Sequence, residues 1–119
     1  MTTQPITIEN GRVTIRPTTN GVWLTQAQIA DLFGVFSAAV NANIRAILKN
    51  GVLHEDRVVR RTCCRNGNIV ERYCLEMITA LAFRLKSENA EVFRRWITER
   101  ATTPAIVWKV PASKDRILN

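Results

Sequence analysis

Apolar residues recur at helical spacing in two short stretches between Leu24 and Gly51. The apolar side of the first stretch consists of Ile29, Leu32 and Phe33. Thr25 and Gln28 form the T-x-x-Q pattern of a capping box, which predicts a helix that begins at Gln26. Gly34 follows the last apolar position, and glycine favours the backbone conformation in which helices end. We therefore expect the first helix to stop there.

The second stretch predicts a helix that Ser37 caps, that reaches Asn50 and that ends at Gly51. Its buried stripe is Val40, Ile44, Ile47 and Leu48. Its outward side is Ala38, Ala42, Arg45 and Lys49, with Asn41 and Asn43 on opposite flanks. A helix, a short turn with glycine and a second helix form a helix-turn-helix, whose second helix can lie in a DNA major groove. The alternative is an ordinary helical hairpin with a solvated outer face.

The outer face of the second helix has few long polar side chains. Its candidate base readers are Asn41, Asn43 and Arg45. Asparagine can pair with adenine and arginine with guanine. Gln26, Ser37 and Lys49 are candidates for phosphate contacts. Because alanines occupy much of the face, we expect weak sequence specificity from this helix alone.

The segment before the helices predicts β structure. Ile6 to Ile8 and Val13 to Arg16 alternate apolar and polar residues around Asn10-Gly11, a strong two-residue hairpin signal. A further turn at Asn20-Gly21 leads into Val22 to Leu24. We expect a small sheet beside the helical pair, with Trp23 and Leu24 in the core.

A second hairpin is predicted between Arg57 and Tyr73, where Asn66-Gly67 indicates a type I′ turn. That turn would pair Arg65 with Asn68, Cys63 with Val70, and Arg61 with Arg72. Arg61, Arg65 and Arg72 would then share one face and could bind the phosphate backbone as a wing beside the helices. Alternatively, these arginines pair with acidic residues elsewhere in the fold or in a second subunit. A one-residue slip in register would exchange the two faces.

Two further helices are expected at the C-terminal end of the domain. Leu75 to Leu85 and Glu88 to about Ala101 both have an apolar stripe, and Ser87 can cap the second. We therefore expect a domain over residues 1–102, followed by a tail over 103–119 with a short β-like run at Ala105 to Val110.

Composition supports one domain with an anionic partner. The 119 residues carry a formal net charge of +7, and 13 of the 17 basic residues are arginine. Such a balance favours a polyanion, because phosphate contacts release counterions, although it could also be a solubility surface. The sequence has neither a signal-peptide pattern nor an apolar run of membrane-spanning length, so we expect a cytoplasmic protein without membrane contact.

No cofactor or catalytic chemistry is expected. Cys63 and Cys64 are adjacent on a predicted strand and would point to opposite faces, so with Cys74 and His54 they do not match a zinc site. We expect buried, inert thiols instead. There is also no Ser, Cys or His constellation, no carboxylate pair and no phosphate-binding glycine loop, which argues against an enzyme.

Three blocks of the chain form a recognisable pattern: V-W-L-T-Q-A-Q-I-A-D-L-F-G-V from Val22, R-Y-C-L-E-M-I-T-A-L-A-F-R-L from Arg72, and F-R-R-W-I-T from Phe93. In this order and spacing they resemble the virulence-associated RhuM family. The chain is more distantly similar to the N-terminal domains of phage antirepressors. The resemblance implies a DNA-binding protein of bacterial mobile elements. Family members have a polar recognition helix of the type D-R-S-T-I-S-R-H-I, whereas this chain has F-S-A-A-V-N-A-N-I from Phe36 to Ile44.

The sequence thus predicts an α+β winged helix-turn-helix with an N-terminal β-hairpin, a β wing and two C-terminal helices. We expect it to bind double-stranded DNA as a homodimer and to regulate transcription, without a small-molecule cofactor. The alternative is a protein-protein interaction module that kept the fold and lost specific DNA binding.

Overall fold

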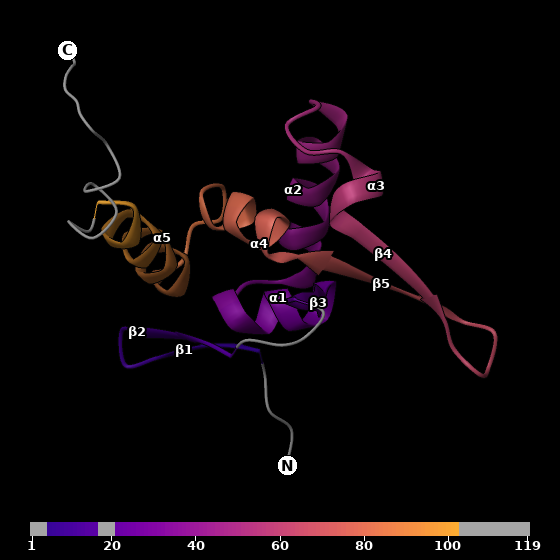
Figure 1. Cartoon of the computed structure of the whole chain (residues 1–119), viewed down its shortest axis with the longest axis horizontal. Helices are drawn as coiled ribbons and strands as arrows, with labels where there is room; N and C mark the ends of the chain where they lie inside the picture. Colours follow the sequence, from indigo (N-terminus) through magenta and orange to yellow (C-terminus); the bar gives the residue numbers. More distant parts are fainter. Residues whose placement is uncertain (1–4, 17–20, 103–119) are drawn as a thin grey trace, which may run out of the picture.

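A computed structural model describes residues 5–16 and 21–102 of the chain (Figure 1). The elements in this part of the chain are β1 (Ile6–Glu9), β2 (Arg12–Ile15), β3 (Trp23–Thr25), α1 (Gln26–Phe33), α2 (Ser37–Lys49), α3 (Glu55–Val58), β4 (Val59–Cys63), β5 (Ile69–Cys74), α4 (Leu75–Ala82) and α5 (Glu88–Ala101). The fold is therefore mixed α+β. The predicted C-terminal tail and its β-like run lie outside the described residues.

The N-terminal hairpin forms as predicted. β1 and β2 are antiparallel, and Glu9 lies opposite Arg12 across a two-residue loop. Both loop residues have positive φ, 53° at Asn10 and 74° at Gly11, as a type I′ turn requires. The hairpin packs against α1 and α5 rather than joining the other sheet.

Local capping signals set the geometry of α1. Thr25 accepts a hydrogen bond from the Gln28 backbone N–H, and the Gln28 side chain accepts one from the Thr25 N–H, so the predicted capping box is confirmed. Gly34 ends the helix in the left-handed conformation, with φ 66° and ψ 39°. The chain then turns by 113° into α2.

The prediction that Ser37 caps α2 is wrong. The N-cap is Phe36, which makes no side-chain capping bond, and Ser37 is the first helical residue. The Ser37 hydroxyl instead accepts a hydrogen bond from the side chain of Gln26 at the start of α1. A contact between two helix starts therefore takes the place of a local cap.

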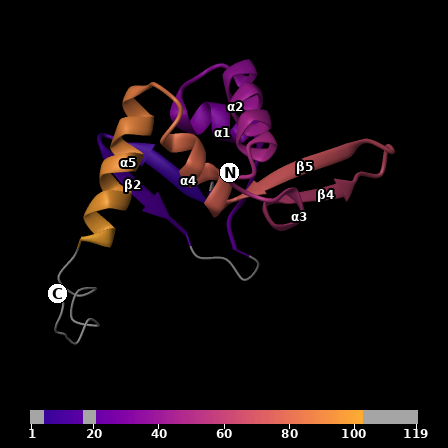
Figure 2. The same cartoon turned by 90° about the horizontal axis from the view of Figure 1, so that it is seen from above.

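The second sheet has the strand order β3-β5-β4, and its β4–β5 hairpin extends away from the helices (Figures 1 and 2). The predicted pairing of this hairpin is wrong by one residue. Arg61 lies opposite Glu71, and Cys63 lies opposite Ile69. Only Gly67 of the Asn-Gly pair has positive φ, at 87°, so the turn cannot be type I′. The loop is one residue longer, because the Cys64 N–H donates to the Asn68 carbonyl.

The changed register separates the arginines that were predicted to share one face. Arg61 is on the face that carries Glu71, whereas Arg72 pairs with Arg60 on the opposite face. Arg65 lies in the turn, between the ends of β4 and β5. The predicted three-arginine face of the hairpin therefore does not form.

The core lies between the helices and the inner faces of both sheets. Its largest fully buried side chains are Phe33, Phe93, Leu24, Ile29, Ile47, Met77, Ile78, Leu81, Val40 and Val58. Phe33 of α1 and Phe93 of α5 pack edge to face, with ring centroids 5.7 Å apart. Trp23 is only half-buried, whereas Leu24 is buried as expected.

The C-terminal helices agree with the predicted pair, with one difference. Ser87 accepts a hydrogen bond from the Ala90 N–H and caps α5 as predicted. However, α4 ends at Ala82 instead of Leu85. The Arg94 guanidinium donates to the carbonyls of Ala82 and Leu85, at 2.7 and 3.1 Å, and so stabilises the turn between α4 and α5.

Among the helices of the described residues, no single one is long and apolar enough to cross a membrane; α1 and α2 meet that test only when the bent pair is taken together.

Candidate nucleic-acid interface

The exposed face of α2 has the composition that the periodicity predicted. Ala38, Ala42, Arg45 and Lys49 are exposed, and Asn41 and Asn43 are half-buried on its two flanks. Arg45 and Lys49 make no ion pair and no side-chain hydrogen bond within residues 5–16 and 21–102. Both cations are therefore available to an anion outside the fold.

The starts of α1 and α2 are joined by the side chain of Gln26. Its Nε2 atom donates to the Ser37 hydroxyl at 2.8 Å and to the Ser37 carbonyl at 3.1 Å. The Ser37 hydroxyl accepts in this bond, so its own hydrogen remains free to donate. The two residues predicted to contact phosphate at the start of the helical pair are thus held together and orient one another.

An open groove of about 610 Å³ separates these helix starts from the β4–β5 hairpin. It is lined by Thr25, Gln26, Ala27 and Ser37 on the helical side and by Arg61, Ile69, Val70, Glu71 and Tyr73 on the hairpin side. The structure therefore brings three predicted phosphate ligands, Gln26, Ser37 and Arg61, to one groove. Neither Arg65 nor Arg72 lines it.

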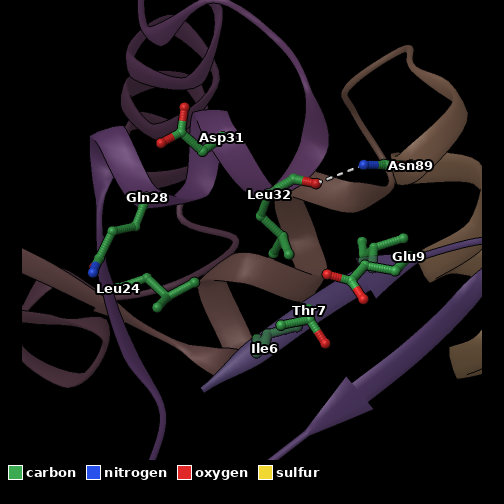
Figure 3. A pocket seen from close by; sticks show the side chains of 9 residues that line it. Ile6, Thr7, Glu9, Leu24, Gln28, Asp31, Leu32 and Asn89 are labelled. Atoms are coloured by element: carbon green, nitrogen blue, oxygen red, sulfur yellow. Dashed lines mark hydrogen bonds between the residues drawn. The ribbon is translucent and has the colours of Figure 1, made fainter. Parts of the chain in front are cut away.

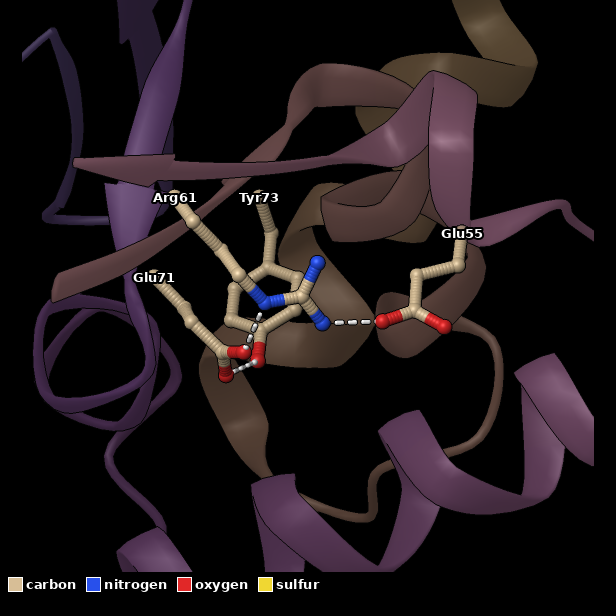
Figure 4. Close-up of polar contacts among 4 residues, drawn as sticks. All are labelled: Glu55, Arg61, Glu71 and Tyr73. Carbon is tan, nitrogen blue, oxygen red and sulfur yellow. Dashed lines mark hydrogen bonds and ion pairs between the residues drawn. The ribbon is translucent and has the colours of Figure 1, made fainter. Parts of the chain in front are cut away.

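Arg61 is paired within the fold (Figure 4). Its guanidinium forms ion pairs with Glu55 of α3 and, at 2.8 Å from Nε, with Glu71 of β5. The hydrogen bonds that its guanidinium donates to Glu55 and, secondly, to Glu71 raise the pKa of Arg61 above its ordinary value. Its charge is therefore balanced by two carboxylates. Of the two interpretations that the sequence left open, pairing with acidic residues describes Arg61.

Tyr73 completes this network from the buried end of β5. Its hydroxyl donates to Glu71 at 3.2 Å. Burial, and secondly the negative charge of Glu71, raise the pKa of Tyr73 to about 12. The neutral phenol thus donates a hydrogen bond that orients the Glu71 carboxylate, and this carboxylate in turn binds Arg61.

The other cations near α2 divide into paired and unpaired groups. Arg57 lies 3.9 Å from Glu76, and the Arg60 guanidinium lies over the Trp23 ring, 4.0 Å from its centroid. Arg65 and Arg72 have no such partner in the described part of the chain. Arg65 in the turn and the two cations of α2 are therefore exposed positive charges that have no ion-pair partner in the described residues.

Asn43 differs from the other predicted base readers because both ends of its amide are bonded. Nδ2 donates to the Ala39 carbonyl at 2.8 Å, and Oδ1 accepts from Nε of Arg84 at 2.9 Å. Asn41 and Arg45 make no such contacts within the described ranges. They lie one turn apart on the same side of α2, with Asn43 on the other flank.

A smaller cavity of about 200 Å³ lies between β1, α1 and the first turn of α5 (Figure 3). Asn89 closes one side by donating to the Leu32 carbonyl at 2.9 Å. Glu9 and Asp31 also line it. Within residues 5–16 and 21–102, no group of three or more His, Cys, Asp or Glu side chains could hold a metal ion.

Several features of this surface were not predicted. Phe36 at the turn before α2 is 86% exposed, and Ile69 at the rim of the groove is 64% exposed. Cys63 and Cys64 are also exposed, which contradicts the expected buried thiols. Cys63 ends β4 and Cys64 follows it at the turn, and this hairpin extends away from the helices (Figure 1), so no core is close enough to cover them. Opposite charges at Arg61 and Glu71 were the sequence signal for the true register.

Comparisons with known proteins find no matching family model, no similar curated protein and no similar solved structure.

Proposed function

We propose that the chain is a winged helix-turn-helix protein that binds double-stranded DNA, with α2 in the major groove and the β4–β5 hairpin as the wing. The supporting observation is the arrangement of the second sheet. A helical pair with a 113° turn is inserted between β3 and β4, and β5 returns between these two strands. Helix-turn-helix pairs cross at about 90–120°. An adjacent hairpin would reach the DNA backbone beside the groove.

The charge on this side of the molecule supports the same proposal. Between Ser37 and Tyr73 the sequence has seven Lys and Arg residues and three Asp and Glu residues. Two of those acids are used by Arg61, so the unpaired cations favour an anionic partner. We assign base contacts to Asn41 and Arg45 and phosphate contacts to Gln26, Ser37, Lys49 and Arg65. We assign no phosphate contact to Arg61, because it is paired with Glu55 and Glu71. We assign none to Arg72 either, because it lies on the sheet face opposite to that of Arg61.

We further propose that the protein acts in the cytoplasm as a homodimer that regulates genes of mobile elements. Two base readers per chain supply little specificity, and a symmetric dimer doubles the contacts over two half-sites. The motif resemblance to the RhuM family supports the biological setting.

Fluorescence anisotropy of a labelled random-sequence duplex, titrated at several salt concentrations, tests the proposal. Log affinity should fall steeply as log salt rises, because each phosphate contact releases counterions. Light scattering on the same samples gives the oligomeric state. Absence of binding at low salt and tens of micromolar protein would refute the proposal.

Two variants distinguish contacts by α2 from general charge effects. Arg45→Ala should weaken binding to a selected site by about 1–3 kcal/mol and relax its sequence preference. Arg95→Ala also removes one positive charge, but from an arginine of α5 that forms an i,i+4 pair with Glu91. It should have little effect on DNA affinity. Equal losses from both variants would exclude a helix inserted in the groove.

A protein-interaction role is the second candidate. The observation that favours it is Phe36, a large apolar side chain that is 86% exposed at the turn before α2. If the duplex does not bind, the same turn becomes the first surface to test. Phe36→Ala should then abolish any self-association that light scattering detects.

A further inference from the structure

The turn between α4 and α5 holds an arginine against the flank of α2. The Nε atom of Arg84 donates to Oδ1 of Asn43 at 2.9 Å, although the two residues are 41 positions apart in the sequence. Arg84 is exposed, and this single bond leaves both terminal nitrogens of the guanidinium with their hydrogens. A planar fork of N–H donors that is fixed at Nε is suited to a phosphate.

Asn43 is poorly suited to reading a base. Bidentate recognition of adenine needs the amide oxygen as acceptor and the amide nitrogen as donor. In this fold Oδ1 is bonded to Arg84, and one hydrogen of Nδ2 is bonded to the Ala39 carbonyl. Oδ1 keeps a second lone pair and Nδ2 keeps a second hydrogen, but the two bonds fix the plane of the amide, so Asn43 is not free to turn towards a base. The arrangement instead orients the guanidinium of Arg84 beside α2.

The turn that carries Arg84 is itself fixed. Arg94 of α5 donates to two carbonyls on either side of Arg84, those of Ala82 and Leu85. Leu85 is buried in the core, and Lys86, the next residue, is exposed and basic. The backbone at Arg84 is therefore anchored on both sides, so the turn does not have to be ordered when a ligand binds.

This turn and the wing hairpin lie on opposite sides of α2 (Figures 1 and 2). The groove beside the hairpin is lined by Ser37 on one flank of α2, and Asn43 is on the other flank. A helix in a major groove has a DNA backbone on each side. Basic groups on both flanks would therefore reach both strands.

We infer that Arg84 is a phosphate-contacting residue, and that Asn43 is its positioning residue rather than a reader of bases. The inference rests on the proposed DNA binding by α2, which it extends by a second phosphate contact on the flank away from the wing. Nothing in the local sequence marks Arg84 for this role, because the fold alone brings it to α2.

The test uses the full chain and a labelled random-sequence duplex of about 20 base pairs, titrated at several salt concentrations. Arg84→Ala should weaken binding about tenfold and reduce the slope of log affinity against log salt by about 0.9. Arg84→Lys should retain most of the slope, because it keeps the charge. Arg95→Ala is the matched control, since it removes an exposed arginine from α5 that is paired with Glu91.

Asn43→Ala should weaken binding to the same duplex about threefold and should add no further loss when combined with Arg84→Ala. A base reader would behave differently. Its loss would appear on a selected site, would be absent on random sequence, and would add to that of Arg84→Ala. Thermal unfolding of each variant shows whether a loss of binding comes from loss of folding.

The outcomes separate the two proposals. Wild-type binding with equal effects of Arg84→Ala and Arg95→Ala would overturn the role of Arg84 and leave DNA binding intact. Additive losses for Asn43 and Arg84 would overturn the positioning role. A wild-type chain that binds no duplex at low salt would overturn both the proposed function and this inference.

Discussion

Replacing Gly34 by alanine should destabilise the fold through backbone strain alone. Gly34 has φ 66° and ψ 39°, and its N–H bonds to carbonyls in the last turn of α1. A Cβ atom added there would meet no heavy atom within 4 Å. The substitution therefore introduces no clash, and its cost is the strain of a left-handed conformation at a residue with a side chain.

The magnitude follows from two opposing contributions. A left-handed conformation costs an L-residue about 1–2 kcal/mol. Alanine also restricts the unfolded chain, which returns about 0.4–1 kcal/mol to the folded state. We therefore expect Gly34→Ala to lower the free energy of unfolding by about 1 kcal/mol. In a domain of this size that corresponds to a fall in Tm of about 4–8 °C.

Urea and thermal denaturation followed by far-ultraviolet circular dichroism measure this change. Gly34→Asn is the matched variant, because asparagine tolerates the left-handed region and should cost less than alanine. An alanine variant as stable as the wild type, or an asparagine variant less stable than the alanine one, would refute the argument. DNA affinity at temperatures where both variants are folded should be unchanged, since the strain lies in the turn and not in α2.

Three further predictions test other parts of the fold. Tyr73, the only tyrosine, should ionise near pH 12 in the folded protein by absorbance at 295 nm and near pH 10 in urea. Because its pKa is raised on folding, stability should be full below pH 10 and fall as pH rises towards 12, and a folded midpoint near 10 would contradict this. With the other cysteines replaced by serine, Ile69→Cys should form a disulfide with Cys63 on oxidation, measured by loss of free thiols, whereas Val70→Cys should not. Thr25→Ala should lower the free energy of unfolding by about 1 kcal/mol in urea titrations, because it removes the α1 cap, and an unchanged midpoint would exclude that role.

Elements specified by neighbouring residues were predicted from the sequence. The capping box at Thr25 and the left-handed position at Gly34 lie within a few residues of the helix end that each one determines. The same holds for Asn10-Gly11, where both residues adopt the positive φ that a type I′ turn needs. The α+β class and the stripes of the helices followed from these local signals and from hydrophobic periodicity.

The register of the second hairpin was not predicted, because an Asn-Gly pair is compatible with two loop lengths. In the three-residue loop only the glycine takes positive φ, and the asparagine side chain accepts a bond from the Asn68 N–H. Interactions beyond the turn favour this choice. Glu55, outside the hairpin, binds Arg61, and the true register puts Glu71 opposite that arginine.

The candidate site was predicted in part for the same reason. The exposed face of α2 depends on helical periodicity, and the structure has it as expected. The contact of Asn43 with Arg84 depends on how α4 packs against α2, and no local pattern encodes it. Likewise, the bond from Gln26 to Ser37 replaced the cap that a single-helix argument assigned to Ser37.

A net charge of +7 does not by itself identify the arginines that would contact DNA. The long-range field that attracts a polyanion depends on the sum of the charges, so paired and unpaired arginines contribute alike. A close contact depends on free N–H donors, and these differ between arginines of the same fold. Arg61 has two carboxylate partners, whereas Arg84 has a neutral amide at one nitrogen. Removing either charge should therefore slow association similarly, but only Arg84→Ala should speed dissociation.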